Sequence, residues 1–282
     1  MTLTPKKSSA RQSVFRSLVL ASAVLVLSSC ETVQTTQSGV VGVSREQRMA
    51  VSADSVEQAS RQQYAALIAA ESKKGTLNRN AAQVNRVRAI ANRLIQQVPA
   101  FRPDAKNWNW EVNVLSEPEV NAWCMPGGKI AVYTGLIDKL QISDDELAAV
   151  LGHEIAHALR EHARERASEQ AVAGLGISIL SAVTGVGNLG QQGMEYAYMG
   201  LLGLPNSRNH ETEADRIGVE LAARAGYDPR AALSLWQKMA RVGGGEPPKF
   251  LSTHPSTQDR LNDLAVYSQR VMPLYEQSRR RN

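Results

Sequence analysis

One stretch, residues 143–160, constrains the fold and chemistry of this chain more than any other. Ser143 and Glu146 form a capping-box pattern, which predicts that a helix begins here. The apolar residues that follow recur at helical spacing, at positions 147, 150, 151, 155, 158 and 159. On such a helix His153 and His157 lie on one face, one turn apart, and Glu154 lies one position round from them.

Two neutral imidazoles at this spacing can bind one zinc ion, and a neighbouring carboxylate can accept the proton of a water that attacks a carbonyl group. The pattern therefore indicates His153 and His157 as metal ligands and Glu154 as a general base. The alternative is a charged amphipathic helix whose histidines are solvated. His162 follows about half a turn out of phase with His153 on a 3.6-residue helix, so we expect it to face solvent.

A catalytic zinc site needs a third protein ligand, and a second predicted helix offers two carboxylates for it. Residues 207–226 read as a helix that is capped by Ser207 or Asn209. Glu211 and Asp215 share one face of this helix, so Glu211 could bind the metal while Asp215 orients a ligand histidine. An acidic first turn that complements the helix dipole explains the same pattern, and the residues alone favour neither interpretation.

At these residues the sequence resembles a known family. His153-Glu154-Ile155-Ala156-His157, followed by Glu211-Thr212-Glu213-Ala214-Asp215, is similar to the signature of the HtpX and CAAX-prenyl-protease group of zinc metallopeptidases, which are gluzincins. Shorter stretches at 126–130, 204–208, 226–229 and 252–255 agree with it. The likeness is greatest to periplasmic lipoprotein proteases of this group. It implies one Zn²⁺ per chain, bound by His153, His157 and Glu211.

The first 29 residues read as a secretory signal peptide. They carry four basic residues and no acidic one, followed by an apolar run at 18–27 that is too short to span a membrane. The segment ends in Leu-Ser-Ser-Cys, which resembles a bacterial lipobox, so we expect Cys30 to carry lipid; cleavage without lipidation is the alternative. Four of the five net positive charges lie in this segment, so the mature chain gives no support for a nucleic-acid partner.

Two further segments bear on location. Glu31 follows the lipobox, which favours an anchor in the periplasm on the inner face of the outer membrane, and residues 30–50 read as a flexible tether. Residues 171–185 are apolar, but they are too few to span a membrane and glycines interrupt them. A lid near the cleft and a plain core helix both fit this segment.

Three other residues carry expectations of their own. His210 is expected to be exposed. His254, in a Ser-Thr-His-Pro loop, could hydrogen-bond an oxyanion, occupy the fourth zinc position in a resting state, or simply lie on the surface. Cys124 has no partner within the chain if Cys30 carries lipid, so we expect it to be a buried small hydrophobic residue.

The rest of the chain alternates between helical and strand patterns. Residues 54–73 and 80–98 read as helices, and residues 108–114 read as a half-buried strand. A hairpin is expected within 121–134, with Gly127 and Gly128 in its turn. An edge strand beside the zinc helix could pair with a substrate strand, and these two glycines would allow the substrate backbone to approach; an ordinary hairpin turn is the alternative.

These patterns predict one α+β, mainly helical domain over residues 51–282, in which a small sheet packs on the His-Glu-x-x-His helix in the zincin-like arrangement that the resemblance implies. The favoured function is a membrane-tethered zinc metalloendopeptidase that degrades unfolded or misfolded envelope polypeptides. The rival is a chaperone or assembly factor for outer-membrane proteins with a structural or latent zinc site. Structural sites are usually closed by four ligands, commonly cysteines, and this chain has two cysteines, so the enzyme is favoured.

Overall fold

The computed structural model describes residues 31–184, 207–242, 248–255 and 257–280, with the backbone alone for residues 175–184. The described fold is built round α5 (Asp144–Leu159), the helix that carries the His-Glu-x-x-His motif. The predicted capping box is present, because Ser143 and Glu146 each accept a hydrogen bond from the other's backbone N–H. Every residue of α5 from Glu146 to Leu159 is buried, so its histidines do not lie on a solvated face.

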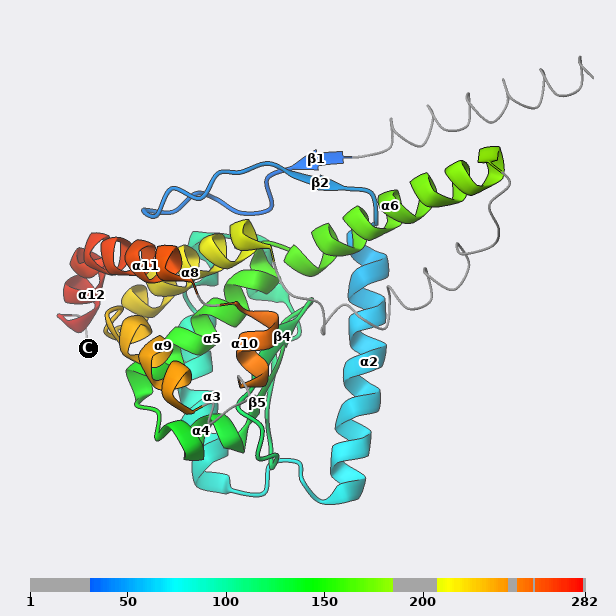
Figure 1. The fold of residues 1–282 in the computed structure, drawn as a ribbon. Helices are drawn as coiled ribbons and strands as arrows, with labels where there is room; N and C mark the ends of the chain where they lie inside the picture. The colour runs from blue at the N-terminus through cyan, green and yellow to red at the C-terminus, as the bar shows by residue number, and fades with distance from the viewer. Residues whose placement is uncertain (1–30, 185–206, 243–247, 256, 281–282) are drawn as a thin grey trace, which may run out of the picture.

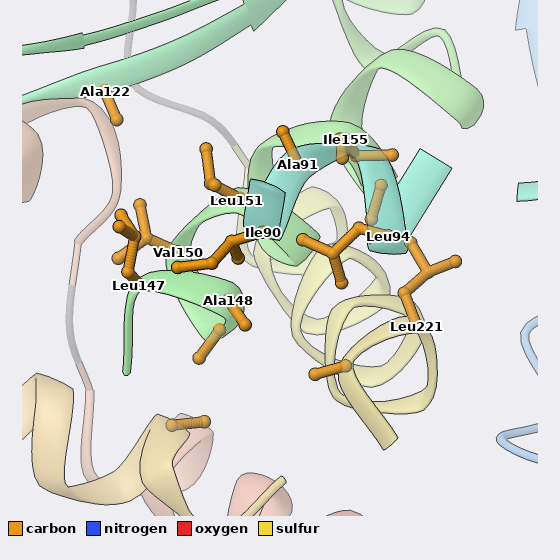
Figure 2. Packing of buried hydrophobic residues seen from close by; sticks show 14 of the residues in the cluster. Ile90, Ala91, Leu94, Ala122, Leu147, Ala148, Val150, Leu151, Ile155 and Leu221 are labelled. Atoms are coloured by element: carbon orange, nitrogen blue, oxygen red, sulfur yellow. The ribbon is translucent and has the colours of Figure 1, made fainter. Parts of the chain in front are cut away.

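Three helices pack round α5 (Figure 1). They are α3 (Ala81–Ile95), α8 (Arg208–Arg224) and α9 (Ala231–Val242). The apolar face predicted for α3 is buried, and Figure 2 shows its residues Ile90 and Leu94 packed among side chains of α5 and Leu221 of α8. Because partners cover α5 on several sides, its apolar and small residues are needed all round the helix rather than along one stripe.

A small mixed sheet lies against α5. It consists of β3 (Glu111–Leu115), β5 (Lys129–Tyr133) and β4 (Ala122–Met125), in that order, with β3 parallel and β4 antiparallel to the central β5. β4 is therefore an edge strand, and it is the strand that packs on α5. The α+β, mainly helical class and the small sheet on the motif helix are confirmed.

The remaining helical elements complete the described fold. They are α2 (Ala53–Lys74), η1 (Val98–Ala100), η2 (Pro103–Asn107), α4 (Thr134–Leu140), α10 (Lys249–Thr253), α11 (Gln258–Arg270) and α12 (Met272–Arg279). The helix expected at 80–98 ends earlier, at Ile95. Its last expected residue, Val98, begins η1, where Pro99 lacks the N–H that an α-helix needs. Thr134 begins α4 rather than ending a strand.

The N-terminal segment differs from the flexible tether that we expected. Residues 31–50, which we call the N-terminal hairpin, contain the antiparallel strands β1 (Glu31–Val33) and β2 (Gln47–Met49). Val41 and Val43 are buried in the main core. These apolar residues are scattered among polar ones without a periodic pattern, and therefore only tertiary contacts reveal that the segment is packed.

The apolar segment expected at 171–185 continues a long helix, α6 (His162–Thr184), which extends away from the body of the domain (Figure 1). No helix among the described residues combines the length and the apolar character needed to cross a membrane. The glycine-rich residues 185–193, which follow this apolar segment, lie outside the described residues.

Candidate metal centre

Three side chains from α5 and α8 meet at one point. His153 Nε2 and His157 Nε2 are 3.0 Å apart on successive turns of α5. Glu211, in the first turn of α8, places Oε1 3.3 Å from His157 Nε2 and Oε2 3.5 Å from His153 Nε2. The two helices predicted to carry metal ligands therefore bring those three side chains together.

The close approach of α5 and α8 depends on two glycines. A Cβ atom on Gly152 would lie 2.8 Å from the carbonyl oxygen of Gly218, and a Cβ atom on Gly218 would lie 2.8 Å from the backbone nitrogen of His153. Only glycine fits at such a backbone-to-backbone contact. Ser207 caps α8 by accepting a hydrogen bond from His210 N, which fixes Glu211 in the first turn, opposite the histidines of α5.

His254 closes the cluster. It caps the end of α10, and its ring stacks on Phe250 with the centroids 4.4 Å apart. Its Nδ1 lies 3.2 Å from His153 Nε2 and 3.0 Å from Glu211 Oε1. The surface position considered for His254 is therefore wrong, since this side chain is buried among the candidate ligands.

The four side chains fit a zinc ion. Their ligand atoms all lie within 4.8 Å of one another, and the neighbouring pairs described above are separated by 3.0–3.5 Å. Tetrahedral zinc bonded at about 2.0–2.1 Å sets its ligand atoms roughly 3.3 Å apart. Imidazole nitrogens with one carboxylate oxygen are also the ligand chemistry that zinc prefers.

Burial and neighbouring charges shift the pKa values of the clustered side chains in different directions. Burial lowers the pKa of His153, but hydrogen bonds to Asp215 and Glu211 outweigh it and raise that pKa to about 10. Burial outweighs the hydrogen bond with Glu211 and holds the pKa of His157 well below its usual value. Burial opposes ionisation of Glu211, but His254 and the two other histidines keep its pKa well below the ordinary range. Glu211 is therefore a carboxylate, as a metal ligand must be.

Behind His153 lies a second layer of charged groups. Asp215 Oδ1 is 2.9 Å from His153 Nδ1, as expected for a residue that orients this ligand. Arg260, in the first turn of α11, donates to both oxygens of Asp215 at 2.8 Å and pairs with Glu211 Oε2 at 2.8 Å. Sequence reasoning missed Arg260. A basic residue in a helix's first turn opposes the helix dipole, and that was the available signal.

Glu154 faces a cavity beside the cluster. The cavity has a volume of about 90 Å³ and is lined by Trp123 and Cys124 of β4 together with Glu154, His157 and His254. The Glu154 carboxylate hydrogen-bonds the backbone of Cys124, and burial raises its pKa. Its Oε1 is buried and makes no hydrogen bond with the described residues. A carboxylate placed in this way is available to take a proton from a molecule in the cavity.

The histidines expected at the surface are buried. His162 is 0 % exposed and His210 is 2 % exposed. The half-turn offset of His162 assumed one continuous helix, but α5 ends at Leu159 and Glu161 takes a positive φ of 51°. The chain therefore turns there and brings His162 Nδ1 within 2.8 Å of His157 Nδ1.

Gly127 and Gly128 form the turn between β4 and β5, with φ values of 79° and 80°. A Cβ atom on Gly127 would contact Glu57, and one on Gly128 would clash with Trp110, so side chains of this chain already cover both glycines. This geometry supports the hairpin-turn alternative rather than contact with a substrate backbone. Cys124 is buried, as expected, and Cys30 lies outside the described residues.

Comparison with known proteins decides the family. The sequence model of Peptidase family M48 matches residues 81–267, which is more than half of the chain and includes every candidate ligand. The chain belongs to peptidase family M48. The resemblance drawn from the two motifs, which was to a group of metallopeptidases, is thereby confirmed.

The M48 relatives that match this chain include both mitochondrial and bacterial proteins. Mitochondrial metalloendopeptidase OMA1 of Arabidopsis thaliana is 42% identical over 158 residues, which cover 56% of this chain and 31% of the plant protein. Metalloendopeptidase OMA1 of Bos taurus is 37% identical over 209 residues, covering 69% and 39%. The beta-barrel assembly-enhancing protease of Yersinia pestis is 28% identical over 203 residues, covering 66% and 39%. This chain thus spans less than half the length of each of these relatives.

Proposed function

We propose that this M48 protein is a zinc metalloendopeptidase, anchored through lipid on Cys30 to the inner face of the outer membrane, that cuts unfolded or misfolded envelope polypeptides in the periplasm. The observation that carries the catalytic part is the cluster of His153, His157 and Glu211 beside Glu154 in one buried cavity. The proposed location is based on the lipobox-like sequence that ends at Cys30. The bacterial relative named for beta-barrel assembly is consistent with an envelope substrate.

The roles of the residues follow from their positions. His153, His157 and Glu211 would hold one zinc ion, which when bound polarises the substrate carbonyl and acidifies water. Glu154 accepts the proton of the attacking water and passes it to the leaving amine. Asp215 orients His153 through Nδ1, and Arg260 holds Asp215 in place. Burial raises the pKa of Glu154, which makes it a stronger base than an exposed glutamate.

The substrate would bind along β4. β4 is an edge strand of the sheet, and its residues Trp123 and Cys124 line the cavity that is also lined by Glu154. An extended segment added to this edge would form main-chain hydrogen bonds whatever its side chains. This mode of binding suits unfolded polypeptides, because they supply an extended backbone without a fixed sequence.

His254 bears on whether the resting enzyme is active. Its Nδ1 points at the ligand atoms of His153 and Glu211, and its Nε2 lies 3.3 Å from Glu154 Oε1. This geometry favours His254 as a fourth ligand over His254 as an oxyanion donor. A site closed by four protein ligands is latent until one of them leaves. The same feature keeps the chaperone alternative, with a latent zinc site, as the second candidate.

Digestion of a reduced, unfolded substrate protein by the purified chain lacking residues 1–29 tests the proposal. We expect cleavage that a chelator abolishes and added zinc restores. His254→Ala should cleave at least as fast as the parental chain if His254 is a fourth ligand, and more slowly if it is an oxyanion donor. Failure of both proteins to cleave while they bind zinc and suppress aggregation of the substrate would favour the chaperone.

A further inference from the structure

A second buried polar cluster lies on the far side of the ligand His157. His162 Nδ1 is 2.8 Å from His157 Nδ1, and His162 Nε2 is 3.1 Å from Glu213 Oε2. Arg160, which is 0 % exposed, donates from Nε to the same oxygen of Glu213 at 3.0 Å. Arg45 of the N-terminal hairpin donates from Nε to Glu213 Oε1 at 2.5 Å. Neither motif of the sequence assigns a role to these residues.

The direction of the hydrogen bonds is fixed by the chemistry of His157. A neutral imidazole that binds a metal through Nε2 carries its proton on Nδ1. His157 Nδ1–H therefore donates to His162 Nδ1. The neutral ring of His162 then carries its own proton on Nε2 and donates it to Glu213. Each nitrogen or oxygen atom in the chain of hydrogen bonds from His157 to Glu213 is therefore assigned as either a donor or an acceptor without conflict.

The two ligand histidines are thus supported in the same way. His153 rests on a carboxylate, Asp215, that Arg260 holds with two hydrogen bonds. His157 reaches its carboxylate, Glu213, one residue further away, through the ring of His162. Outer partners of this kind fix the tautomer and the orientation of a metal ligand, and removing them typically weakens metal binding 10–100-fold.

The second cluster is not arranged to hold a metal of its own. His162, Glu165 and His210 have ligand atoms within 4.8 Å of one another. The guanidinium of Arg45, however, already bridges the two carboxylates there, with contacts of 2.6 Å to Glu165 Oε1 and 2.5 Å to Glu213 Oε1. A divalent cation would have to displace this arginine and break the hydrogen bond from His162 to Glu213.

The N-terminal hairpin reaches this cluster with two side chains. Besides Arg45, Gln47 donates from Nε2 to the carbonyl oxygen of Arg160 at 2.7 Å and to Glu165 Oε2 at 2.5 Å. In return, Arg160 Nη2 donates to the carbonyl oxygen of Arg45 at 2.9 Å. Gln47 is 0 % exposed. These contacts join the segment that follows Cys30 to the back of the metal centre.

We propose that His162 and Glu213 are positioning residues that hold His157 in its metal-binding tautomer and orientation, and that Arg45 completes this support from the N-terminal hairpin. This inference rests on the proposed zinc site at His153, His157 and Glu211. It makes the residues next to the proposed membrane anchor a part of the metal centre's supporting structure.

Zinc affinity tests the role of His162. The parental chain lacking residues 1–29, His162→Phe and His162→Asn are compared by competition with a chromogenic chelator, alongside thermal melting of the zinc-free proteins. Phe removes the acceptor for His157, so we expect 10–100-fold weaker zinc binding. The Asn side-chain oxygen stands near the Nδ1 position and restores the acceptor, so His162→Asn should bind more tightly than His162→Phe. If His162 had only a structural role, its replacement would lower the melting temperature without producing this order of zinc affinities.

Glu213→Gln and Glu220→Gln form a matched pair. Both carboxylates are buried on α8. Glu220 accepts a hydrogen bond from Val41 N and pairs with Arg224, and within the described part of the chain it makes no hydrogen bond with His162 or His157. We expect Glu213→Gln to weaken zinc binding about 10-fold and Glu220→Gln to leave it unchanged. Glu213→Gln and His162→Asn also keep the test decisive if His162→Phe does not fold.

Arg45→Met and Arg48→Met test the contribution of the hairpin. Arg48 lies on the exposed face of β2, so its replacement controls for loss of one positive charge. We expect several-fold weaker zinc binding in Arg45→Met alone.

Parental affinity in folded His162→Phe, His162→Asn and Glu213→Gln would overturn the inference while leaving the proposed zinc site intact. Two zinc ions in the parental chain, with one lost in His162→Asn, would also overturn it, because the second cluster would then be a metal site. A parental chain that binds no zinc would instead refute the proposed function itself.

Discussion

At the scale of single residues, His153 and His157 in the candidate metal centre are each linked to a carboxylate that an arginine holds. His153 uses Asp215 and Arg260, and His157 uses Glu213 through His162. Glu154 belongs to neither of these two sets of hydrogen-bonded residues. Its neighbours are the backbone of Cys124, the His254 ring and the cavity. Its chemistry can therefore be tested separately from metal binding.

Glu154→Gln should bind zinc normally and lose proteolysis. The amide keeps the size of the side chain but cannot accept a proton, and general-base catalysis is typically worth about 10²–10⁴-fold. Gel-based digestion of an unfolded substrate, with zinc content and melting temperature measured on the same sample, checks this. Digestion at the parental rate by a zinc-loaded Glu154→Gln protein would show that the site is not hydrolytic.

Glu211→Ala should lose its bound zinc. Glu211 lies 3.3 Å from His157 Nε2 and is buried between the two ligand histidines, whereas Glu213 lies behind them, against Arg160 and His162. Elemental analysis after dialysis checks the outcome, with Glu213→Ala as the comparison. Full zinc in Glu211→Ala, with complete loss in Glu213→Ala, would show that the direct ligand has been misassigned.

At the scale of elements, the crossing of α5 and α8 sets the distance between the ligands. Gly152→Ala places a methyl group 2.8 Å from the Gly218 carbonyl oxygen, so the helices must separate. We expect a loss of about 1–3 kcal/mol of stability and weaker zinc binding. Gly174→Ala in α6 is the control, because a Cβ atom there meets nothing within 4 Å and alanine is the better helix former. Urea unfolding and zinc titration of both variants measure the contrast, and parental behaviour of Gly152→Ala would contradict it.

The cap of α5 makes stability depend on pH. Burial favours the neutral form of Glu146, but hydrogen bonds from Lys238, the backbone of Ser143 and Ser234 outweigh it and lower its pKa from 4.5. A carboxylate whose pKa is lower in the folded state stabilises the protein above its unfolded pKa, and this contribution disappears as pH falls through the folded pKa. Glu146→Gln should therefore melt a few degrees below the parental chain at neutral pH.

That difference should shrink as pH falls below 4.5 and disappear once the pH is below the lowered pKa of Glu146 in the folded protein, where protonation has removed the parental advantage. Melting curves of the two zinc-free proteins at several pH values check it. Lys238→Met should reproduce much of the effect, because Lys238 Nζ lies 2.6 Å from Glu146 Oε2. A difference that stayed constant over the whole range would mean that Glu146 acts through its shape rather than its charge.

At the scale of the whole molecule, the segment that follows the proposed anchor, Cys30, contacts the back of the candidate metal centre. Glu31 begins β1, and Arg45 and Gln47 of the same hairpin contact the cluster behind His157. A lipid on Cys30 would therefore hold the protease close to the membrane through a packed segment rather than a loose tether. α6 extends from the body of the domain on the side of this hairpin (Figure 1).

Cys30→Ala should release the protein from membranes. The Leu-Ser-Ser-Cys sequence that ends at Cys30 resembles a lipobox, so a lipid on Cys30 is the anchor that we expect to matter. Fractionation of cells that express the parental and Cys30→Ala chains, with lipid labelling of the parental protein, measures this. If Cys30→Ala remained with the membranes, a segment such as the apolar part of α6 would have to contact lipid.

The sequence by itself determined the local features of this protein. The capping box at Ser143 and the spacing of His153, His157, Glu211 and Asp215 depend on residues within one or two helical turns of one another. For the same reason the main helices and the β4–β5 hairpin could be predicted. The two motifs were also sufficient to recognise the family.

Only the tertiary structure determined which distant residues complete the site. Arg260 reaches the centre from α11, His254 from the end of α10, and Arg45 from the N-terminal hairpin. His162 was misplaced because one residue, Glu161, turns the chain between two helices that the periodic pattern had joined. Such contacts depend on how elements far apart in the chain pack together, and no spacing along the sequence records that.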